Sequence, residues 1–372
     1  MDVNYGSSAP FTLGVEEELQ LVSAETHALA SRYAEVFGEA ARRDDRIRPE
    51  LLQSTVEVAT TPAATVAQAV AEAAELRRRA RDEAEARGVA VISAGTHPFS
   101  RYEHQDVTEK ERYEDLVEAL RWVVERQLIF GLHVHVGLQT AQQAIAVANA
   151  LRTWLPELLA VSANSPFWHG RDSGLASTRS KVFDAMPRSG LPPAFASFEE
   201  FELVVERGVR TNSFEDYTFI WWDLRPHPRL GTIEIRICDA QTRVESVAAI
   251  VALVQSLVAT LAGRYERDGV LDTQPITLVQ ENKWRAVRYG LEATLVDLAH
   301  DDERPAREAL RELVELARPA AQRLGCSDEL GLVEGILERG DGASEQRRVY
   351  EEAGGNLLAV AQWLGRTTVD GL

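Results

Sequence analysis

The stretch from Phe11 to Val22, FTLGVEEELQLV, alternates between apolar and polar side chains with a period of two. That period predicts a β-strand with one buried and one polar face. Glu16 and Glu18 project from the polar face in the same direction, because they lie two residues apart. Glu17 falls on the apolar side and is the exception to the pattern. The stretch therefore predicts a sheet strand that presents two carboxylates together.

Two later segments repeat this arrangement. Residues 51–59 alternate with Glu57 on the polar face, and residues 232–237, TIEIRI, place Glu234 and Arg236 opposite three isoleucines. If these strands are neighbours of the first, four carboxylates converge on one site. Like charges that close raise one another's pKa, and a divalent cation among them removes the conflict. Hard oxygen ligands select Mg²⁺, Mn²⁺ or Ca²⁺. The alternative is that each glutamate is a solvated residue on an exposed face.

Histidines and arginines occur on the same kind of strand. His133 and His135 share one face of the predicted strand 132–138. They could bind zinc with a further ligand, contact a phosphate or metal beside the carboxylates, or be hydrogen-bonded sheet histidines. Arg236, and Arg225 on the preceding strand, could clamp a phosphate or form a salt-bridged sheet face.

Two further basic segments are candidates for anion binding. The segment 164–194 is rich in Gly, Ser and cations, including Arg179, and has little periodicity. A loop this long inside a domain is often functional, so we expect either a mobile anion-binding lid or a solvated loop. Lys283 and Arg285 form a second basic cluster, on a predicted helix.

The remaining pattern predicts an α+β fold in which strands dominate the first two thirds and helices the last third. Further strands are expected at 89–94 and 219–224. Expected helices, with their capping residues, are 61–88 (Thr61, Pro62), 108–130 (Thr108, Glu111), 141–163, an apolar helix after Thr242 and Glu245, and helices from 305 to 364.

Composition excludes several classes of protein. The formal net charge of −18 makes a nucleic-acid partner unfavourable. The N-terminal residues 1–10 lack the basic and apolar segments of a signal peptide. The apolar stretch 247–262 is interrupted by polar residues and is shorter than the roughly 20 residues that a bilayer needs, so we expect a buried helix. Two cysteines do not indicate an oxidising compartment. We therefore expect a cytoplasmic protein with no membrane partner.

Several segments together resemble the carboxylate–amine ligase family related to glutamate–cysteine ligase, its type 2 group. They run in order through residues 11–295. The matching segments are Gly14–Leu19, Glu57–Pro62, Ala94–Pro98, Gly131–Gly137, Ser162–Gly174, Arg225–Arg236 and Glu281–Gly290.

The resemblance implies a glutamine-synthetase-like fold, in which an antiparallel sheet flanked by helices forms a funnel for ATP, metals and the acid substrate. It implies one catalytic domain over 1–372, with a sheet-based core at 11–295 and C-terminal helices at 300–372. A homodimer is a further family-level expectation. The sequence has no phosphate-binding P-loop, dinucleotide fingerprint or Gly-x-Ser-x-Gly elbow, so ATP would bind through metals and arginines on the sheet.

The resemblance, together with the basic clusters above, gives a set of expected site residues. The expected Mg²⁺ or Mn²⁺ ligands are Glu16, Glu18, Glu57, Glu234 and His133. The expected nucleotide contacts are His133, Arg225, Arg236, Lys283 and Arg285. The expected catalytic residues are Arg236 and Arg179, which would stabilise the transferring phosphoryl group, and Glu50, which would accept the proton of the amine.

The expected reaction joins a small acid, such as glutamate, to an amine through an acyl phosphate, forming a γ-glutamyl amide and releasing ADP and phosphate. One alternative is a metal-dependent hydrolase centred on His133, His135 and Glu234. Another is a non-catalytic relative that binds a nucleotide or metabolite. Binding alone does not require four strand glutamates, which argues against the last alternative.

Overall fold

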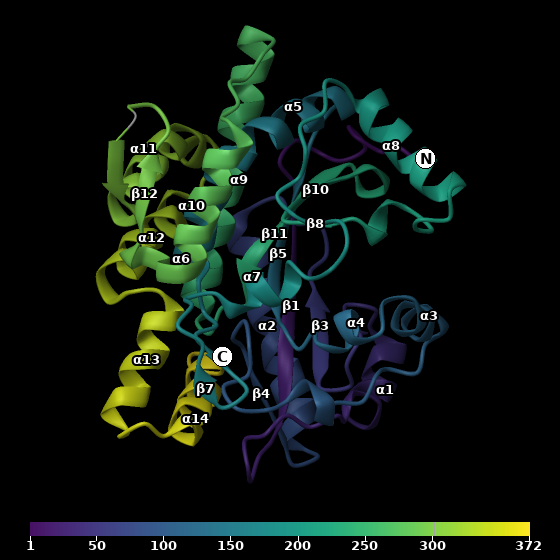
Figure 1. Ribbon diagram of the computed structural model, residues 1–372, viewed down its shortest axis with the longest axis vertical. Helices are drawn as coiled ribbons and strands as arrows, with labels where there is room; N and C mark the ends of the chain where they lie inside the picture. Colours follow the sequence, from purple (N-terminus) through teal and green to yellow (C-terminus); the bar gives the residue numbers. More distant parts are fainter. Residues whose placement is uncertain (301) are drawn as a thin grey trace.

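The computed structural model describes residues 1–300 and 302–372. At its centre is a seven-stranded sheet in the order β10-β11-β5-β1-β3-β2, with β4 also paired to β1 (Figure 1). Every pairing in this sheet is antiparallel, as predicted. Its strands are β1 (Leu13–Ser23), β2 (Ile47–Pro49), β3 (Thr55–Ala59), β4 (Val89–Ile92), β5 (Gly131–Gly137), β10 (Leu224–His227) and β11 (Thr232–Asp239). The strand of the two histidines, β5, lies between β1 and β11.

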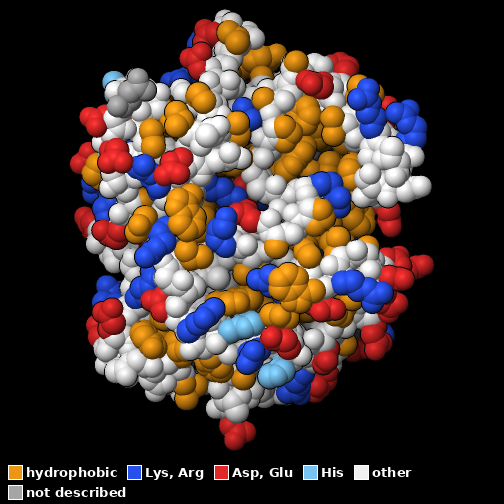
Figure 2. All heavy atoms as spheres, viewed as in Figure 1, with side chains coloured by type: hydrophobic (Ala, Val, Ile, Leu, Met, Phe, Trp, Pro, Cys, Tyr) orange, Lys and Arg blue, Asp and Glu red, His pale blue; other side chains and the backbone are white. Residues whose placement is uncertain are grey.

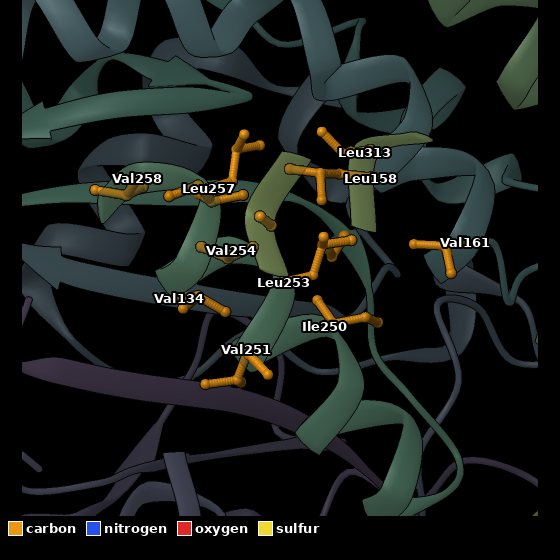
Figure 3. Packing of buried hydrophobic residues seen from close by; sticks show 14 of the residues in the cluster. Val134, Leu158, Val161, Ile250, Val251, Leu253, Val254, Leu257, Val258 and Leu313 are labelled. Atoms are coloured by element: carbon orange, nitrogen blue, oxygen red, sulfur yellow. The ribbon is translucent and has the colours of Figure 1, made fainter. Parts of the chain in front are cut away.

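Helices cover the apolar face of the sheet. They are α2 (Val66–Glu85), α5 (Ala141–Leu151), α6 (Leu155–Ser162) and α9 (Val244–Asp268). Figure 3 shows Leu253, Val254 and Leu257 of α9 beside Val134 of β5 and Leu158 of α6, all within one buried cluster. The apolar stretch 247–262 is therefore a buried helix, as expected.

Two helical segments are long and apolar enough to cross a membrane by length and composition alone. They are Ala141–Ser162 and Val244–Asp268. Within the fold, 78% and 89% of their most apolar windows are buried, which is how core helices of a folded domain behave.

The C-terminal helices are α10 (Ile276–Tyr289), α11 (Ala306–Leu324), α12 (Ser327–Arg339), α13 (Gly342–Glu352) and α14 (Leu357–Thr368), beside the hairpin of β12 (Thr294–Asp297) and β13 (Asp302–Pro305). Helices α10 to α12 contribute to the same core as α9, whereas α13 and α14 belong to smaller clusters. Helices α11 and α12 pack on α9, and α14 packs on β4 (Figure 1). We infer a single domain, because one hydrophobic cluster runs from Leu13 to Leu337.

Shorter elements complete the fold. The helices are α1 (Tyr33–Arg43), α3 (Glu111–Leu120), α4 (Trp122–Glu125), α7 (Thr178–Phe183) and α8 (Phe198–Arg210). The strands are β6 (Phe167–Trp168), β7 (Arg171–Asp172), β8 (Ser189–Gly190) and β9 (Trp221–Trp222). The 3₁₀ turns are η1 (Tyr102–His104), η2 (Arg152–Trp154), η3 (Tyr217–Phe219), η4 (Pro228–Leu230) and η5 (Gly290–Glu292).

Two predicted helix starts are wrong because the hydroxyls expected to cap them donate hydrogen bonds to other groups. Thr61 donates to Glu72 at 2.8 Å, and α2 begins instead after Thr65, whose side chain accepts from a backbone N–H of the first turn. Thr242 donates to the backbone oxygen of Ser93 at 2.8 Å and does not cap α9.

The predicted helix 108–130 is also corrected. It is divided into α3 and α4 at Arg121, which has a positive φ of 48°. Thr108 does not cap it, because its hydroxyl donates to the backbone oxygen of Glu50 at 2.6 Å.

The segment 164–194 is not a structureless lid. It contains β6, β7, α7 and β8, and Ser165, Ser177 and Arg179 within it are buried. The buried carboxylate of Asp239 accepts hydrogen bonds from both serine hydroxyls. The packing contradicts the expected lid and makes this segment part of the wall of the fold.

Candidate active site

The polar face of the sheet forms the floor of a cavity of about 390 Å³. Most of the side chains that the sequence singled out line it. These are Glu16, Glu18, Glu50, Glu57, His133, His135, Arg179, Arg225, Glu234 and Arg236. The glutamates that were predicted from separate strands therefore converge.

Strand register explains the convergence. Glu18 lies opposite Glu57 on β3, and Glu16 lies opposite His133 on β5. Glu234 lies opposite His135 on one side and opposite Arg225 on the other. Directly opposed residues of an antiparallel pair have Cβ atoms about 5 Å apart, so each row is a set of contacts across the sheet.

One group of potential ligands is already balanced by positive charge. Single atoms of Glu16, His133 and Glu234 all lie within 4.8 Å of one another. Arg225 donates from Nε to Glu234 Oε2 at 2.8 Å, and Arg236 pairs with the other oxygen. Burial opposes ionisation of Glu234, but the two guanidinium groups hold its pKa well below the usual range. This carboxylate is therefore ionised.

A second group crowds three carboxyl groups together. Glu18, Glu50 and Glu57 also offer atoms within 4.8 Å of one another. Burial and the neighbouring carboxylates raise the pKa of Glu57 well above its usual range. Burial and the charge of Glu18 raise the pKa of Glu50 to about 7. Arg48 on β2 approaches this group, with Nη1 3.4 Å from Glu57 Oε1. Crowding of this kind is what a bound cation relieves.

The pKa values of the two histidines are shifted in opposite directions. Burial, followed by the charge of Arg236, lowers the pKa of His133 and favours the neutral imidazole that a metal ligand requires. Its Nε2 atom is buried and has no hydrogen-bond partner among the described residues. Burial opposes the charged form of His135, but Glu234 and Glu16 raise its pKa above the usual value.

Arg179 reaches the cavity from α7 and is only 3% exposed. Its guanidinium donates to the backbone oxygens of Arg236 at 3.1 Å and Ile237 at 3.3 Å. The pairing of β11 with β5 is irregular at these two residues, and a bulge of this kind leaves backbone groups free. Within residues 1–300 and 302–372, no carboxylate lies within 4.0 Å of this guanidinium. Arg179 is therefore a buried cation with no ion-pair partner in the described chain.

Lys283 and Arg285 do not line this cavity, which corrects their predicted role. Lys283 faces inward from α10 and lies between Asp184 and Asp223, at 2.9 and 2.8 Å. Arg285 lies on the outer side of α10 and pairs with Glu281 and Glu303. Both side chains are neutralised away from the candidate site.

The sequence did not indicate several residues that line the cavity. They are Lys110, Arg112, Tyr113, Phe219 and Trp221, near its rim, and it also gave no sign of Arg48 beside Glu57. Lys110 and Arg112, at the start of α3, could have been noticed in the sequence as a basic pair. The position of Arg48 beside Glu57 follows only from the pairing of β2 with β3.

Comparisons with known proteins identify the family of the chain. The family model of glutamate–cysteine ligase family 2 matches residues 12–362. A Rubrobacter xylanophilus protein named "Putative glutamate--cysteine ligase 2-1" is 44% identical over 359 residues, which cover 94% of this chain and 93% of the relative. A Sorangium cellulosum protein named "Putative glutamate--cysteine ligase 2" is 43% identical over 343 residues, covering 91% and 92%.

Solved structures share the fold. Glutamate–cysteine ligase from Francisella tularensis in complex with AMP superposes with a TM-score of 0.70 at 13% identity, covering 100% of this chain and 90% of that one. A bifunctional glutathione synthetase from Pasteurella multocida gives 0.66 at 15% identity, with 97% of this chain and 52% of that one covered. Because the family match spans nearly the whole sequence and the relatives align end to end, the chain belongs to glutamate–cysteine ligase family 2, a family of ligases.

Proposed function

We propose that this protein is an ATP- and Mg²⁺-dependent carboxylate–amine ligase that forms an amide, with glutamate–cysteine ligation as the nearest named activity. The observation that carries the proposal is the cavity floor. Two groups of carboxylates lie on it beside two mostly buried arginines, Arg179 and Arg236. Phosphoryl transfer between anions needs this combination of metal ligands and fixed cations.

The donor set fits Mg²⁺ or Mn²⁺. Carboxyl oxygens dominate both groups, the second group crowds three carboxyls together, and the Nε2 atom of His133 has no hydrogen-bond partner among the described residues. Glu16, His133 and Glu234 would hold one cation, and Glu18, Glu50 and Glu57 another. Bound there, the cations would neutralise the phosphate oxygens of ATP. We therefore reassign Glu50 from proton acceptor to metal ligand, since it lies among the other carboxylates.

The reaction follows from the placement of the arginines. The substrate carboxylate attacks the γ-phosphorus of ATP, giving ADP and an acyl phosphate. A neutral amine then displaces phosphate from the acyl carbon, and the departing phosphate takes the proton that the amine loses. In the part of the chain described, the Arg179 guanidinium pairs with no carboxylate and the Nε of Arg236 has no hydrogen-bond partner. Both guanidinium groups would bind oxygens of the transferring phosphoryl group and stabilise the negative charge that shifts during the transfer.

The setting is consistent with an enzyme of small metabolites. Cys238 and Cys326 are both buried free thiols, which suits a reducing compartment. In Figure 2, acidic and basic side chains are interspersed over the visible face. We propose a cytoplasmic enzyme that acts on a small acid and a small amine and forms a homodimer.

The test is a screen for ADP release over pairs of acids and amines, with Mg²⁺ or Mn²⁺ and mass detection of the amide. We expect release that depends on both substrates, with glutamate and cysteine as the first pair. Glu57→Gln should lower it by at least about 100-fold, whereas the exposed control Glu39→Gln should leave it unchanged. Zinc-dependent turnover without ATP would indicate a hydrolase instead, and nucleotide binding with no ADP release from any pair would indicate a non-catalytic relative.

A further inference from the structure

Helix α7 is only six residues long, yet it carries Arg179 into the cavity. A helix this short has little stability of its own, so its position depends on what holds its ends. Two buried charged residues, Asp239 and Lys283, lie at opposite ends of α7, and neither lines the cavity. We propose that Asp239 and Lys283 are positioning residues that clamp α7 at its two ends and thereby hold the Arg179 guanidinium over the cavity floor. The consequence for turnover rests on the proposed function.

Asp239 holds the N-terminal end. Its Oδ1 accepts a hydrogen bond at 2.9 Å from Ser177, the residue that caps α7. Its Oδ2 accepts from the Ser165 hydroxyl at 2.6 Å and from the backbone N–H of Asn164 at 2.8 Å. The Ser165 oxygen in turn accepts the backbone N–H of Arg179 at 3.1 Å. One carboxylate at the end of β11 therefore fixes both the cap of the helix and the backbone of Arg179.

Lys283 holds the C-terminal end. Its Nζ lies 2.9 Å from Oδ1 of Asp184, the C-cap residue of α7, and 2.8 Å from Oδ2 of Asp223. Asp223 precedes β10, and its backbone oxygen accepts the N–H of Arg236 at 2.8 Å. Burial opposes the charge of Lys283, but the two aspartates raise its pKa above the usual value, so it stays an ammonium. The lysine thus sets the spacing between the helix of Arg179 and the strand of Arg236.

The Arg179 side chain has few contacts outside its own helix, where the centre of the Phe183 ring lies 5.7 Å from its guanidinium. Its guanidinium bonds to two neutral backbone oxygens, and its Nε has no partner within the described residues. Gly131 leaves the space that it occupies, since an added Cβ there would overlap the guanidinium. Two hydrogen bonds to backbone oxygens oppose displacement less than a bidentate pair with a carboxylate would, so a shift of α7 would carry the guanidinium with it.

Lys181 provides a matched control on the same helix. It pairs with the other oxygen of Asp184 at 2.7 Å, but its side chain is 45% exposed and it does not reach Asp223. Lys181→Met therefore removes an ion pair of the same aspartate without releasing α7 from the strand.

The first test is a double-mutant cycle on kcat for ADP release. We expect Lys283→Met to lower kcat by about 100-fold, since displacements near 1 Å have that effect, and Lys181→Met to change it less than about twofold. In an Arg179→Ala background, Lys283→Met should then cost less than about twofold more, because both changes remove one function. An equal loss in both backgrounds, or a Lys283→Met enzyme with near-normal kcat, would overturn the proposal.

The second test does not depend on turnover. Backbone amides of residues 178–183 should exchange with deuterium at least about tenfold faster in Lys283→Met and Asp239→Asn, while the amides of α9 keep their wild-type rates. If Lys283→Met does not fold, Asp184→Asn releases the same end and leaves the Lys283–Asp223 pair intact. Unchanged exchange at α7 would refute the clamp. Faster exchange in a chain that releases no ADP would uphold the clamp and refute the proposed reaction.

Discussion

At the scale of single residues, carboxyl groups are crowded together at the place in the cavity where a cation is proposed to bind. Glu57 is 9% exposed and lies near the carboxylates of Glu18 and Glu50, with Arg48 3.4 Å away. Neighbouring carboxylates that raise one another's pKa also destabilise the folded chain until a cation is bound. Stability and activity should therefore respond to Glu57 in opposite directions.

We predict that Glu57→Gln raises the melting temperature of the metal-free protein by at least about 2 °C. The folded chain must either bind a proton at Glu57 or keep its charge among the neighbouring carboxylates, and glutamine has neither cost. Added Mg²⁺ should stabilise the wild type and have a smaller effect on the variant. Thermal melts with EDTA and with a Mg²⁺ series check both points, with Glu39→Gln as the exposed control. A lower melting temperature in EDTA would show that the repulsion is compensated within the protein.

A second residue-scale prediction concerns Glu157, a buried carboxyl on α6. Its Oε2 has no hydrogen-bond partner in the described structure, and the nearest cation, Arg304, is 4.0 Å away. Burial raises the pKa of Glu157 to about 7, against 4.5 for the exposed group. The folded chain therefore holds this proton more tightly than the unfolded chain. The stability it contributes is complete below pH 4.5 and is lost as the pH rises through 7.

Glu157→Gln should remove this part of the pH dependence. Between pH 6 and 8.5 the wild type should lose about 1–2 kcal/mol relative to the variant. Urea unfolding of both proteins at the two pH values measures the difference. If the two curves shift in parallel, the carboxyl is already ionised at pH 6 and the assigned pKa is wrong.

At the scale of elements, one buried ion pair docks α2 against the sheet. Arg77 is fully buried and donates from Nε to Glu17 at 2.9 Å, and to the backbone oxygens of Gln241 and Thr242. Glu17 is the residue that broke the polar–apolar alternation of β1. Its partner explains the exception, because a carboxylate can face the core when a guanidinium meets it there.

Arg77→Met should lower the free energy of unfolding by about 3–5 kcal/mol, since it leaves the Glu17 carboxylate buried without a partner. Adding Glu17→Met should recover much of the loss. Arg78→Met, one residue away on the exposed side of α2, should cost less than about 1 kcal/mol. Denaturant melts of the three variants provide the measurement, and an equal loss for Arg77→Met and Arg78→Met would contradict the role of the buried pair.

At the scale of the whole molecule, the central sheet has one face covered by helices and one open polar face. Helix α9 packs against the sheet on one side and against α11 and α12 on the other, so these two C-terminal helices share its core (Figures 1 and 3). The polar face is left open as the floor of the cavity. The site is thus built on rigid strands and is closed laterally by α7 and the start of α3.

The sequence by itself determined which side chains share the polar face of each strand. A period of two is a local property of extended backbone, so Glu16 with Glu18, and Glu234 with Arg236, follow without knowledge of any partner strand. The apolar run of α9 is also a local property of the sequence, and it was enough to predict a buried helix. The same kind of prediction failed for Thr61 and Thr242, whose hydroxyls donate to Glu72 and to the backbone oxygen of Ser93 instead of capping a helix.

Only the tertiary structure decided which of these faces meet. Strand order places β5 between β1 and β11, and no periodicity encodes that order. Glu50 lies outside the strands and still belongs to the second carboxylate group. Arg179 reaches the cavity from a segment whose sequence predicts a loop. Lys283 is of a residue type that often binds phosphate, but its ammonium group contacts two aspartates. Each of these outcomes is set by contacts between residues far apart in the chain, which local spacing does not specify.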